Sequence, residues 1–360
     1  MKRLAVFILF IIPTISFGQY KYGFLQETFF GRQPSARAEA MGRGYSSIDG
    51  DLTSIFYNPA GIATINGLEI DGSFSSPYYL AKYAKYNFTS IGYRFNDYVI
   101  IALSRNNFTL GQEITYTDIN GNSLGTATPK NSNYTLTFSS QPIKNLFLGL
   151  STNYFIWQPI NKSATAIYFD FGVIKKIDFL QKDGFNHSIN IGASITNVNY
   201  SKATIEFNGN TGTENFPVIT RYGANYQFIL NKGFLIDTLK TFKFLLQGDY
   251  KMLLNSQYHS GIHTGAEFKF LEILSVRVGY YKEKQYDYDI PTSNKNEISA
   301  ITYGFGLQLP IDKLTQIPLN INFDYTSLPQ PTYSVNRVIW DNFTTYNLRL
   351  NWIFKKNNNP

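Results

Sequence analysis

The sequence predicts an all-β protein, a 14-stranded antiparallel transmembrane β-barrel with an N-terminal plug segment. Three observations lead to this prediction. The 360-residue chain is rich in aromatic residues, with 27 Tyr and 30 Phe, and has no cysteine. Its segments alternate apolar and polar residues, which is typical of strands with one face in lipid and the other in a lumen. The connections between these segments alternate between short and long, as in bacterial outer-membrane barrels.

The N-terminus predicts export to the outer membrane. Lys2 and Arg3 form a positively charged start, and residues 4–15 are mostly apolar before a short run of small residues. We therefore expect a signal peptide over residues 1–18, cleaved before Gln19. The apolar run is too short to span a bilayer, and no later stretch approaches the ~20 apolar residues of a membrane helix. Without cysteine, a lipoprotein anchor and disulfides are excluded.

The alternation is clearest in residues 242–252, 319–325 and 346–354. One face of each segment carries bulky aliphatic and aromatic side chains, and the other carries Gly, Asn, Ser and charged residues. A half-buried strand of a soluble sandwich also alternates. A barrel in lipid, however, places the bulky side chains outside and the polar groups inside. We therefore predict that the charged faces line a lumen.

Fourteen such segments lie between residues 67 and 354, and an even number is typical of single-chain bacterial barrels. The expected strands begin near Leu68, Lys85, Tyr98, Asn133, Leu146, Ala164, Ser188, Val218, Phe242, Ile262, Leu274, Ala300, Leu319 and Thr344. Short links such as 96–97 and 271–273 alternate with long polar links such as 108–131 and 327–342. Because short turns face the periplasm and long loops face outward, both termini are expected on the periplasmic side.

The same strand directions predict where two tryptophans lie. Aromatic residues favour the headgroup level of a bilayer. The parity of the strands places Trp157 at the outer end and Trp352 at the periplasmic end. We therefore expect them near opposite membrane interfaces.

Charged side chains of both signs are predicted on the lumen-facing side of the strands. They are Glu69, Asp71, Asp170, Asp249, Glu267 and Asp324, together with Arg221, Lys243, Lys251, Lys269, Arg277 and Arg349. Nearly balanced charges are expected to pair across the lumen rather than build a field of one sign. An ion-selective pore would instead carry a ring of one charge. Hydrating and bracing the interior is the simpler interpretation of each of these residues.

The sequence offers no signature of catalysis, of a metal site or of a cofactor. His259 and His263 would lie ~13 Å apart along a strand, too far for one metal ion. Residues 118–125 (DINGNSLG) resemble part of a calcium loop but lack its closing Glu, and Asn-Gly favours a hairpin turn. No nucleophile elbow or phosphate-binding glycine loop occurs. We expect no enzyme, and the scattered net charge of +7 and the export signal argue against a nucleic-acid partner.

The segment before the first strand differs from the rest of the chain. Residues 19–66 are rich in small residues (PSARAEAMGRG) but also contain apolar ones such as Ile55 and Phe56, which argue against a disordered tail. Helix and turn are permitted inside a wide barrel because protein, not lipid, surrounds them there. We therefore predict a plug over residues 19–66, a barrel over 67–354 and a periplasmic tail over 355–360.

Local rules predict how the plug segment folds. Asp51 is expected to cap a short helix. That helix should end before Asn58-Pro59, because the residue before a proline avoids the α region. Gly61 is expected to turn with a positive φ.

In this segment the sequence resembles the PorV/PorQ family of Bacteroidetes outer-membrane proteins, within the wider FadL-like group. The residues that carry the resemblance are Ser35, Ala36, Arg37, Ala38, Met41 and Gly42, then Asp51, and then Asn58, Pro59, Ala60 and Gly61. The pattern is fairly specific when both halves occur in this order behind a signal peptide. The resemblance implies an N-terminal hatch in a 14-stranded barrel.

The resemblance leaves two functions open. PorV-like proteins serve type IX protein secretion, which implies a surface-assembly component that binds the translocon or its cargo proteins. FadL-like proteins pass long-chain fatty acids or other hydrophobic small molecules across the outer membrane, which implies a transporter. The aromatic loops at 77–83 and 285–291 favour the first, because exposed tyrosine is common in recognition surfaces. The polar lumen also disfavours a long apolar conduit. In either case, outer-membrane lipids surround the barrel.

Overall fold

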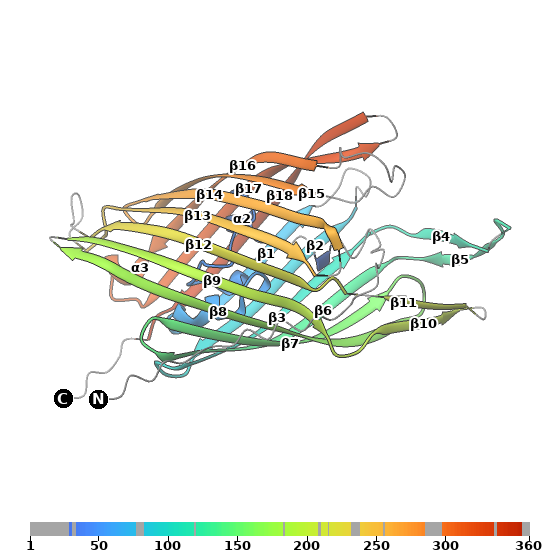
Figure 1. The fold of residues 1–360 in the computed structure, drawn as a ribbon, viewed down its shortest axis with the longest axis horizontal. Helices are drawn as coiled ribbons and strands as arrows, with labels where there is room; N and C mark the ends of the chain where they lie inside the picture. Colours follow the sequence, from blue (N-terminus) through green and yellow to red (C-terminus); the bar gives the residue numbers. More distant parts are fainter. Residues whose placement is uncertain are drawn as a thin grey trace.

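The computed structural model describes residues 29–30, 34–76, 83–118, 120–182, 184–207, 210–214, 216–231, 238–254, 256–284, 297–334 and 337–354. These residues form a closed antiparallel barrel of 14 strands (Figure 1). The barrel strands are β1 (Leu68–Ser76), β2 (Lys85–Arg94), β3 (Val99–Thr109), β6 (Lys130–Ile143), β7 (Leu146–Gln158), β8 (Ala164–Lys182), β9 (Phe185–Asn199), β12 (Ile219–Leu230), β13 (Phe242–Leu253), β14 (Ser256–Phe270), β15 (Leu274–Lys284), β16 (Glu297–Pro310), β17 (Leu319–Ser334) and β18 (Arg337–Trp352). β1 pairs with β18 and closes the sheet. The predicted fold class and strand number are confirmed.

Two hairpins that the sequence analysis did not predict lie outside the barrel sheet. They are formed by β4 (Ile114–Thr117) with β5 (Ser123–Ala127) and by β10 (Ala203–Phe207) with β11 (Asn210–Glu214). In Figure 1 both extend beyond the barrel at the end that carries the long connections, which we call the loop end. Between β4 and β5, Asp118 accepts hydrogen bonds from the backbone N–H groups of Asn120 and Asn122. Its carboxylate therefore stabilises a tight turn.

The opposite end of the barrel, which we call the turn end, is where β1 begins and β18 ends. The connections here are short, and the β16–β17 link contains a single helical turn, α3 (Ile311–Leu314). At the loop end some strands are longer than predicted, and β18 begins at Arg337 rather than near Thr344. The reason is that β17 and β18 stay paired as a hairpin up to Ser334 opposite Arg337. Ladder hydrogen bonds extend a strand wherever its partner continues, whatever the hydrophobic pattern.

The two faces of the wall have the predicted polarity. On β13, Leu246 points outward with 50% of its surface exposed, whereas its neighbour Gln247 points inward with 3% exposed. The outward positions of the described strands are mostly Leu, Ile, Val, Phe and Tyr, and the inward positions are mostly Ser, Thr, Asn and charged residues. An apolar outer surface around a polar interior is the arrangement of a transmembrane barrel.

The register also fixes the positions of the two tryptophans. Trp157 lies opposite Ala164 at the loop end of the β7–β8 pair. Trp352 lies opposite Leu68 at the turn end of the β1–β18 pair. Their predicted placement at opposite ends of the barrel is confirmed, but Trp157 packs against the buried apolar residues inside the loop end, so its placement at a membrane interface stays a prediction.

Some predicted features lie outside the described residues. These are the signal peptide at 1–18, residues 19–28 and 31–33 of the predicted plug, the tail at 355–360, the aromatic loop at 285–291 and all but the last residue of the loop at 77–83. The side chain of His259 is likewise outside the described part. Among the described helices, none has both the length and the apolar character needed to cross a bilayer.

Barrel closure generates a first prediction. Gly67 precedes β1 with a φ of +76°, and a Cβ atom there would lie 2.0 Å from the carbonyl oxygen of Trp352. Replacing Gly67 with Ala should lower the free energy of unfolding by about 1–3 kcal/mol, the usual range for a strained backbone residue. Urea unfolding in lipid vesicles, followed by tryptophan fluorescence, measures this change. Gly248→Ala is the matched control, because no atom lies within 4 Å of a Cβ at Gly248. Equal stability of the two variants would contradict the prediction.

Candidate functional site in the barrel lumen

Residues 34–66, here called the lumen segment, lie inside the barrel. They contain the short α-helix α2 (Ala36–Ala40) and two 3₁₀ helices, η1 (Leu52–Phe56) and η2 (Pro59–Thr64). Helix α2 packs against β15–β18, whereas η2 packs against β3 and β6–β8. These two groups of strands lie on opposite sides of the closed strand order. The lumen segment therefore spans the interior from one wall to the other.

The Asn58-Pro59-Ala60-Gly61 motif docks against a glycine-lined part of the wall. A Cβ atom at Gly149 on β7 would lie 2.2 Å from the backbone nitrogen of Ala60, and one at Gly172 on β8 would lie 1.9 Å from Oδ1 of Asn58. The Asn58 amide donates to the carbonyl oxygen of Val173 at 3.1 Å, while its Oδ1 accepts from the backbone N–H of Ala60 at 3.0 Å. The backbone of the motif reaches the wall because the wall has no side chains there.

Two local predictions for this motif need correction. Gly61 does not adopt a positive φ. Glycine is required at this position for another reason, because a Cβ atom at Gly61 would lie 2.6 Å from the side chain of Ser54. Asp51 precedes η1, as predicted, but makes no side-chain cap to it. The Asp51 carboxylate is used instead by an ion-pair network, which outcompetes capping because its partners are charged.

The first half of the PorV/PorQ-like motif, Ser35 to Gly42, is held to the opposite wall by hydrogen bonds. Ser35 caps α2 by accepting from the backbone N–H of Ala38. At the end of the helix, Thr302 on β16 accepts from the backbone N–H of Gly42 at 3.0 Å and donates to the carbonyl oxygen of Ala40 at 2.9 Å. Ala36, Ala38 and Met41 are fully buried. Small side chains therefore let this turn of helix lie against the strands.

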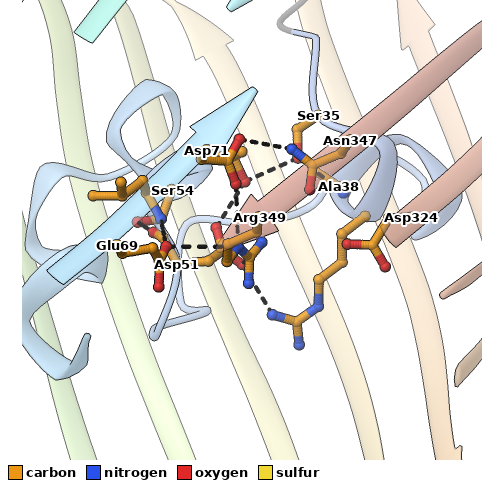
Figure 2. A network of polar contacts seen from close by, with 12 residues as sticks. Ser35, Ala38, Asp51, Ser54, Glu69, Asp71, Asp324, Asn347 and Arg349 are labelled. Carbon is orange, nitrogen blue, oxygen red and sulfur yellow. Dashed lines mark hydrogen bonds and ion pairs between the residues drawn. The ribbon is translucent and has the colours of Figure 1, made fainter. Parts of the chain in front are cut away.

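Arg349 is the centre of one ion-pair network, drawn in Figure 2. Its guanidinium lies 3.1 Å from Asp71, 3.5 Å from Glu69 and 3.5 Å from Asp51. Asn347, next to it on the lumen face of β18, donates to Asp71 at 2.6 Å. Arg349 thus joins β18, β1 and the lumen segment through three carboxylates.

Arg37 extends this network across the lumen. Its Nε and Nη2 donate to both carboxylate oxygens of Glu267 at 2.9 and 2.8 Å, and its Nη1 donates to Asp51 at 3.0 Å. Glu267 also accepts from Arg277 at 2.6 Å, and Arg277 donates in turn to Asp324 at 2.7 Å. Bidentate and charge-assisted pairs are the strong class of hydrogen bond. Arg37 and Asp51 therefore connect the lumen segment directly to β14 and β18, and through their partners to β15, β17 and β1.

The burial of Asp51 is balanced by these partners. Burial alone raises the pKa of Asp51, but the charges of Arg349 and Arg37 outweigh burial and hold the pKa below its usual value. Burial also holds the pKa of Tyr45 well above its usual value, so the Tyr45 hydroxyl keeps the proton that it donates to Asp51. Asp51 is consequently ionised although none of its surface is exposed.

The remaining predicted lumen charges also face inward, at separate places. Asp249 accepts from the backbone N–H groups of Tyr45 and Ser46, both at 2.7 Å, and so also holds the lumen segment. Asp170 accepts from Asn153 and from the backbone N–H of Asn197, both at 2.7 Å. Arg221 donates to Thr196 at 3.2 Å, and Lys251 pairs with Glu283 at 2.9 Å. Lys269 donates to Gln308 at 2.7 Å, and Lys243 lies opposite Lys269 on the neighbouring strand.

A cluster around Glu283 was not predicted from the sequence. Lys251, Arg43 and His263 lie 2.9, 3.6 and 3.4 Å from Glu283 Oε1, and His263 Nδ1 bonds the carbonyl oxygen of Gly42 at 2.7 Å. The signal for Glu283 was its phase, because it follows Arg277 at an even spacing on β15. Within the described residues, no group of three or more His, Cys, Asp or Glu is placed to hold a metal ion.

A buried aromatic cluster at the loop end, which we call the aromatic pocket, was also not predicted from the sequence. Its walls are Tyr86, Phe108, Phe155, Tyr168 and Phe216, with Ala84, Ala164, Ala166, Ala203 and Ile205. Phe29 and Phe30 of the same chain fill it, with only 1% and 3% of their surfaces exposed. Their ring centroids lie 5.4 and 5.3 Å from that of Phe155. The available signal was phase, since Phe155 lies on the inward face of β7 together with Asn153.

Comparison with known proteins gives similarity of architecture only. No protein-family model matches the chain, and no curated protein matches it. The toluene transporter TodX of Pseudomonas putida is 11% identical, with a TM-score of 0.45 over 89% of this chain and 97% of that one. A FadL homologue of Pseudomonas aeruginosa is 10% identical, with a TM-score of 0.45 over 90% and 99%. The toluene transporter TbuX of Ralstonia pickettii is 12% identical, with a TM-score of 0.47 over 91% and 100%.

These similarities concern the shape of a FadL-like barrel and do not identify a transported compound. None of the three structures is a PorV or PorQ protein.

The docking of the lumen segment generates a second prediction. Valine in place of Gly149 would occupy the position of the Ala60 backbone and should displace the lumen segment while the strand ladder stays intact. The expected result is a higher ion conductance in planar bilayers, with unchanged heat-modifiable mobility on gels as the folding check. Gly72→Val is the matched control, because a Cβ there meets only the ring of Phe74, at 3.4 Å. A folded Gly149→Val barrel with the conductance of the parent protein would refute this docking mode.

Proposed function

We propose that this protein is a bacterial outer-membrane barrel that passes a hydrophobic small molecule inward from the loop end. In this proposal the lumen segment is a plug that has to shift during passage. The observation that carries the proposal is the aromatic pocket at the loop end, which is filled by Phe29 and Phe30 of the same chain. The apolar outer face of the barrel supports its placement in the outer membrane.

The pocket is an apolar site in a barrel whose inward positions are mostly polar. Five aromatic side chains from β2, β3, β7, β8 and the chain before β12 surround the two phenylalanine rings. Ring pairs such as Phe30 with Phe216, at 5.2 Å, are in the favourable edge-on arrangement. Burying apolar surface here stabilises any occupant by roughly 25 cal/mol per Å². A free molecule with a ring or a short alkyl chain would therefore compete with Phe29 and Phe30 for the same space.

The lumen segment lies on the route from this pocket to the turn end. Phe56 and Ile55 of η1 lie just beneath the pocket, together with Asn106 and Asp170 of the wall. A molecule that leaves the pocket inward therefore meets the lumen segment first. Its anchors are ion pairs and hydrogen bonds to the wall, which an apolar molecule does not replace, so passage requires these anchors to open and re-form.

Removal of the two occupant rings generates a third prediction. The Phe29→Ala/Phe30→Ala double variant should bind the fluorescent probe N-phenyl-1-naphthylamine about tenfold more tightly, because the probe no longer competes with the protein's own side chains. A tenfold change corresponds to about 1.4 kcal/mol. Fluorescence titration of the full chain in lipid nanodiscs measures the affinity. Adding Phe155→Asp to the double variant should abolish the gain, because it places a charge in the wall of the pocket.

Phe74→Ala/Phe138→Ala is the matched control. Both residues face outward and are 51% and 44% exposed, so their removal takes away two rings without touching the pocket. If the control and the Phe29→Ala/Phe30→Ala variant gain affinity equally, the probe binds at the lipid boundary and the proposed pocket is wrong.

Protein binding in secretion or surface assembly, as in PorV-like proteins, is the second candidate. It is favoured by the two hairpins that extend past the loop end and by Tyr200 beside β10, which is 75% exposed. A photo-crosslinker in place of Tyr200 should then form a discrete adduct with a secreted or surface protein in the native membrane. Unimpaired uptake of hydrophobic compounds by cells lacking the protein, together with such an adduct, would favour this candidate over transport.

A further inference from the structure

We propose that the turn end of the lumen holds a binding site for a hydrophilic organic anion with carboxylate or phosphate groups, built around Lys243 and Lys269. The site is a cavity of about 420 Å³ between the lumen segment and the turn end of the wall. This volume is within the range of small-ligand pockets. The cavity is separate from the aromatic pocket. The proposal for this site does not depend on whether the protein transports a hydrophobic molecule.

The two lysines form a directly opposed pair of like charges. Lys243 on β13 is the register partner of Lys269 on β14, and both side chains are half-buried on the lumen face. Like charges directly opposite each other across two strands destabilise a sheet. Within the described residues Lys243 has no ion pair or hydrogen bond, and Lys269 donates only to the amide oxygen of Gln308 at 2.7 Å. The described contacts therefore leave both charges without a carboxylate.

Two carboxylates near the lysines, Glu267 and Asp324, are bound by arginines, whereas Asp49, which also lines the cavity, accepts from Thr64 at 2.8 Å and from Asn190 at 2.9 Å. Glu267 accepts from Arg37 through both oxygens and from Arg277 at 2.6 Å. Asp324, which also lines the cavity, accepts from Arg277 at 2.7 Å. Because guanidinium groups hold Glu267 and Asp324 in charge-assisted bonds, these two carboxylates are not available to turn toward the lysines. A bound anion would supply the missing negative charge.

The rest of the lining indicates that the anion has a hydrophilic body. Gln227, Asn320, Asn322 and Asn351 contribute amide groups to the cavity wall. The Oδ1 atoms of Asn320 and Asn351 are buried and have no hydrogen-bond partner among the described residues. Buried polar atoms are normally paired. A ligand with hydroxyl or amide groups would bond the amide groups that line the cavity, whereas an alkyl chain would not.

Calorimetric titration of the full chain in detergent micelles at low salt tests the site, with inorganic phosphate and succinate as separate probes. Saturable binding of at least one probe is expected. The Lys243→Gln/Lys269→Gln variant should lose at least tenfold in affinity, and Lys243→Arg/Lys269→Arg should keep it. The matched control, Lys85→Gln/Lys175→Gln, removes two outward-facing lysines and the same net charge, and should bind like the parent protein.

A second measurement checks binding through stability. A ligand that binds only the folded state raises the free energy of unfolding in proportion to the logarithm of its concentration. The probe that binds should therefore raise the urea midpoint of the parent and of the arginine variant but leave that of the glutamine variant unchanged. The proposal is overturned if the parent protein binds neither probe saturably. It is also overturned if the outward-facing control loses affinity as much as Lys243→Gln/Lys269→Gln, since the attraction would then be to net charge only.

Discussion

A carboxylate with no exposed surface lies inside this barrel, and the pairing of its charge organises the interior. Asp51 belongs to the lumen segment. Of its two arginine partners, Arg349 is on the wall strand β18 and Arg37 is in helix α2 of the same segment. Breaking a buried ion pair by removing one partner typically costs about 3–5 kcal/mol, because the other charge is left uncompensated. The path of the lumen segment is therefore constrained by where the two arginines are. Replacing the whole network by apolar residues would remove this constraint, so the network contributes position more than net stability.

Shape adds a second constraint to charge. A 14-stranded barrel leaves more space than wall side chains can fill. Here the segment enters that space as helices of five or six residues with small side chains, and it meets wall positions that carry glycine. The two halves of the PorV/PorQ-like motif lie against opposite walls, so the sequence between them, including Asp51, spans the lumen. Each half of the motif therefore has its own wall.

Much of this architecture could be predicted from the sequence, for a physical reason. In a wall between lipid and a polar interior, apolar and polar side chains alternate along every strand. The number of strands and the inward orientation of Asp71 and Arg277 can therefore be predicted from this alternation. The conformation of Gly61 could not be read, because glycine serves equally for a positive φ and for close packing. The pairing of Arg37 with Glu267 joins residues 230 positions apart, and no local pattern encodes such a contact. The aromatic pocket was missed because inward aromatics interrupt a face that was interpreted as uniformly polar.

The position of Arg349 has a consequence for how the molecule assembles. Arg349 is in the last strand, Asp71 is in the first strand, and Asp51 is in the segment just before it. One side chain thus ties together the two ends of the sheet and the contents of the barrel. The first and last strands meet only after the intervening chain has been organised, and such distant contacts form late because closing a long loop is entropically costly. Ring closure and filling of the interior therefore share one final step, in which the lumen segment is enclosed as the first strand finds the last.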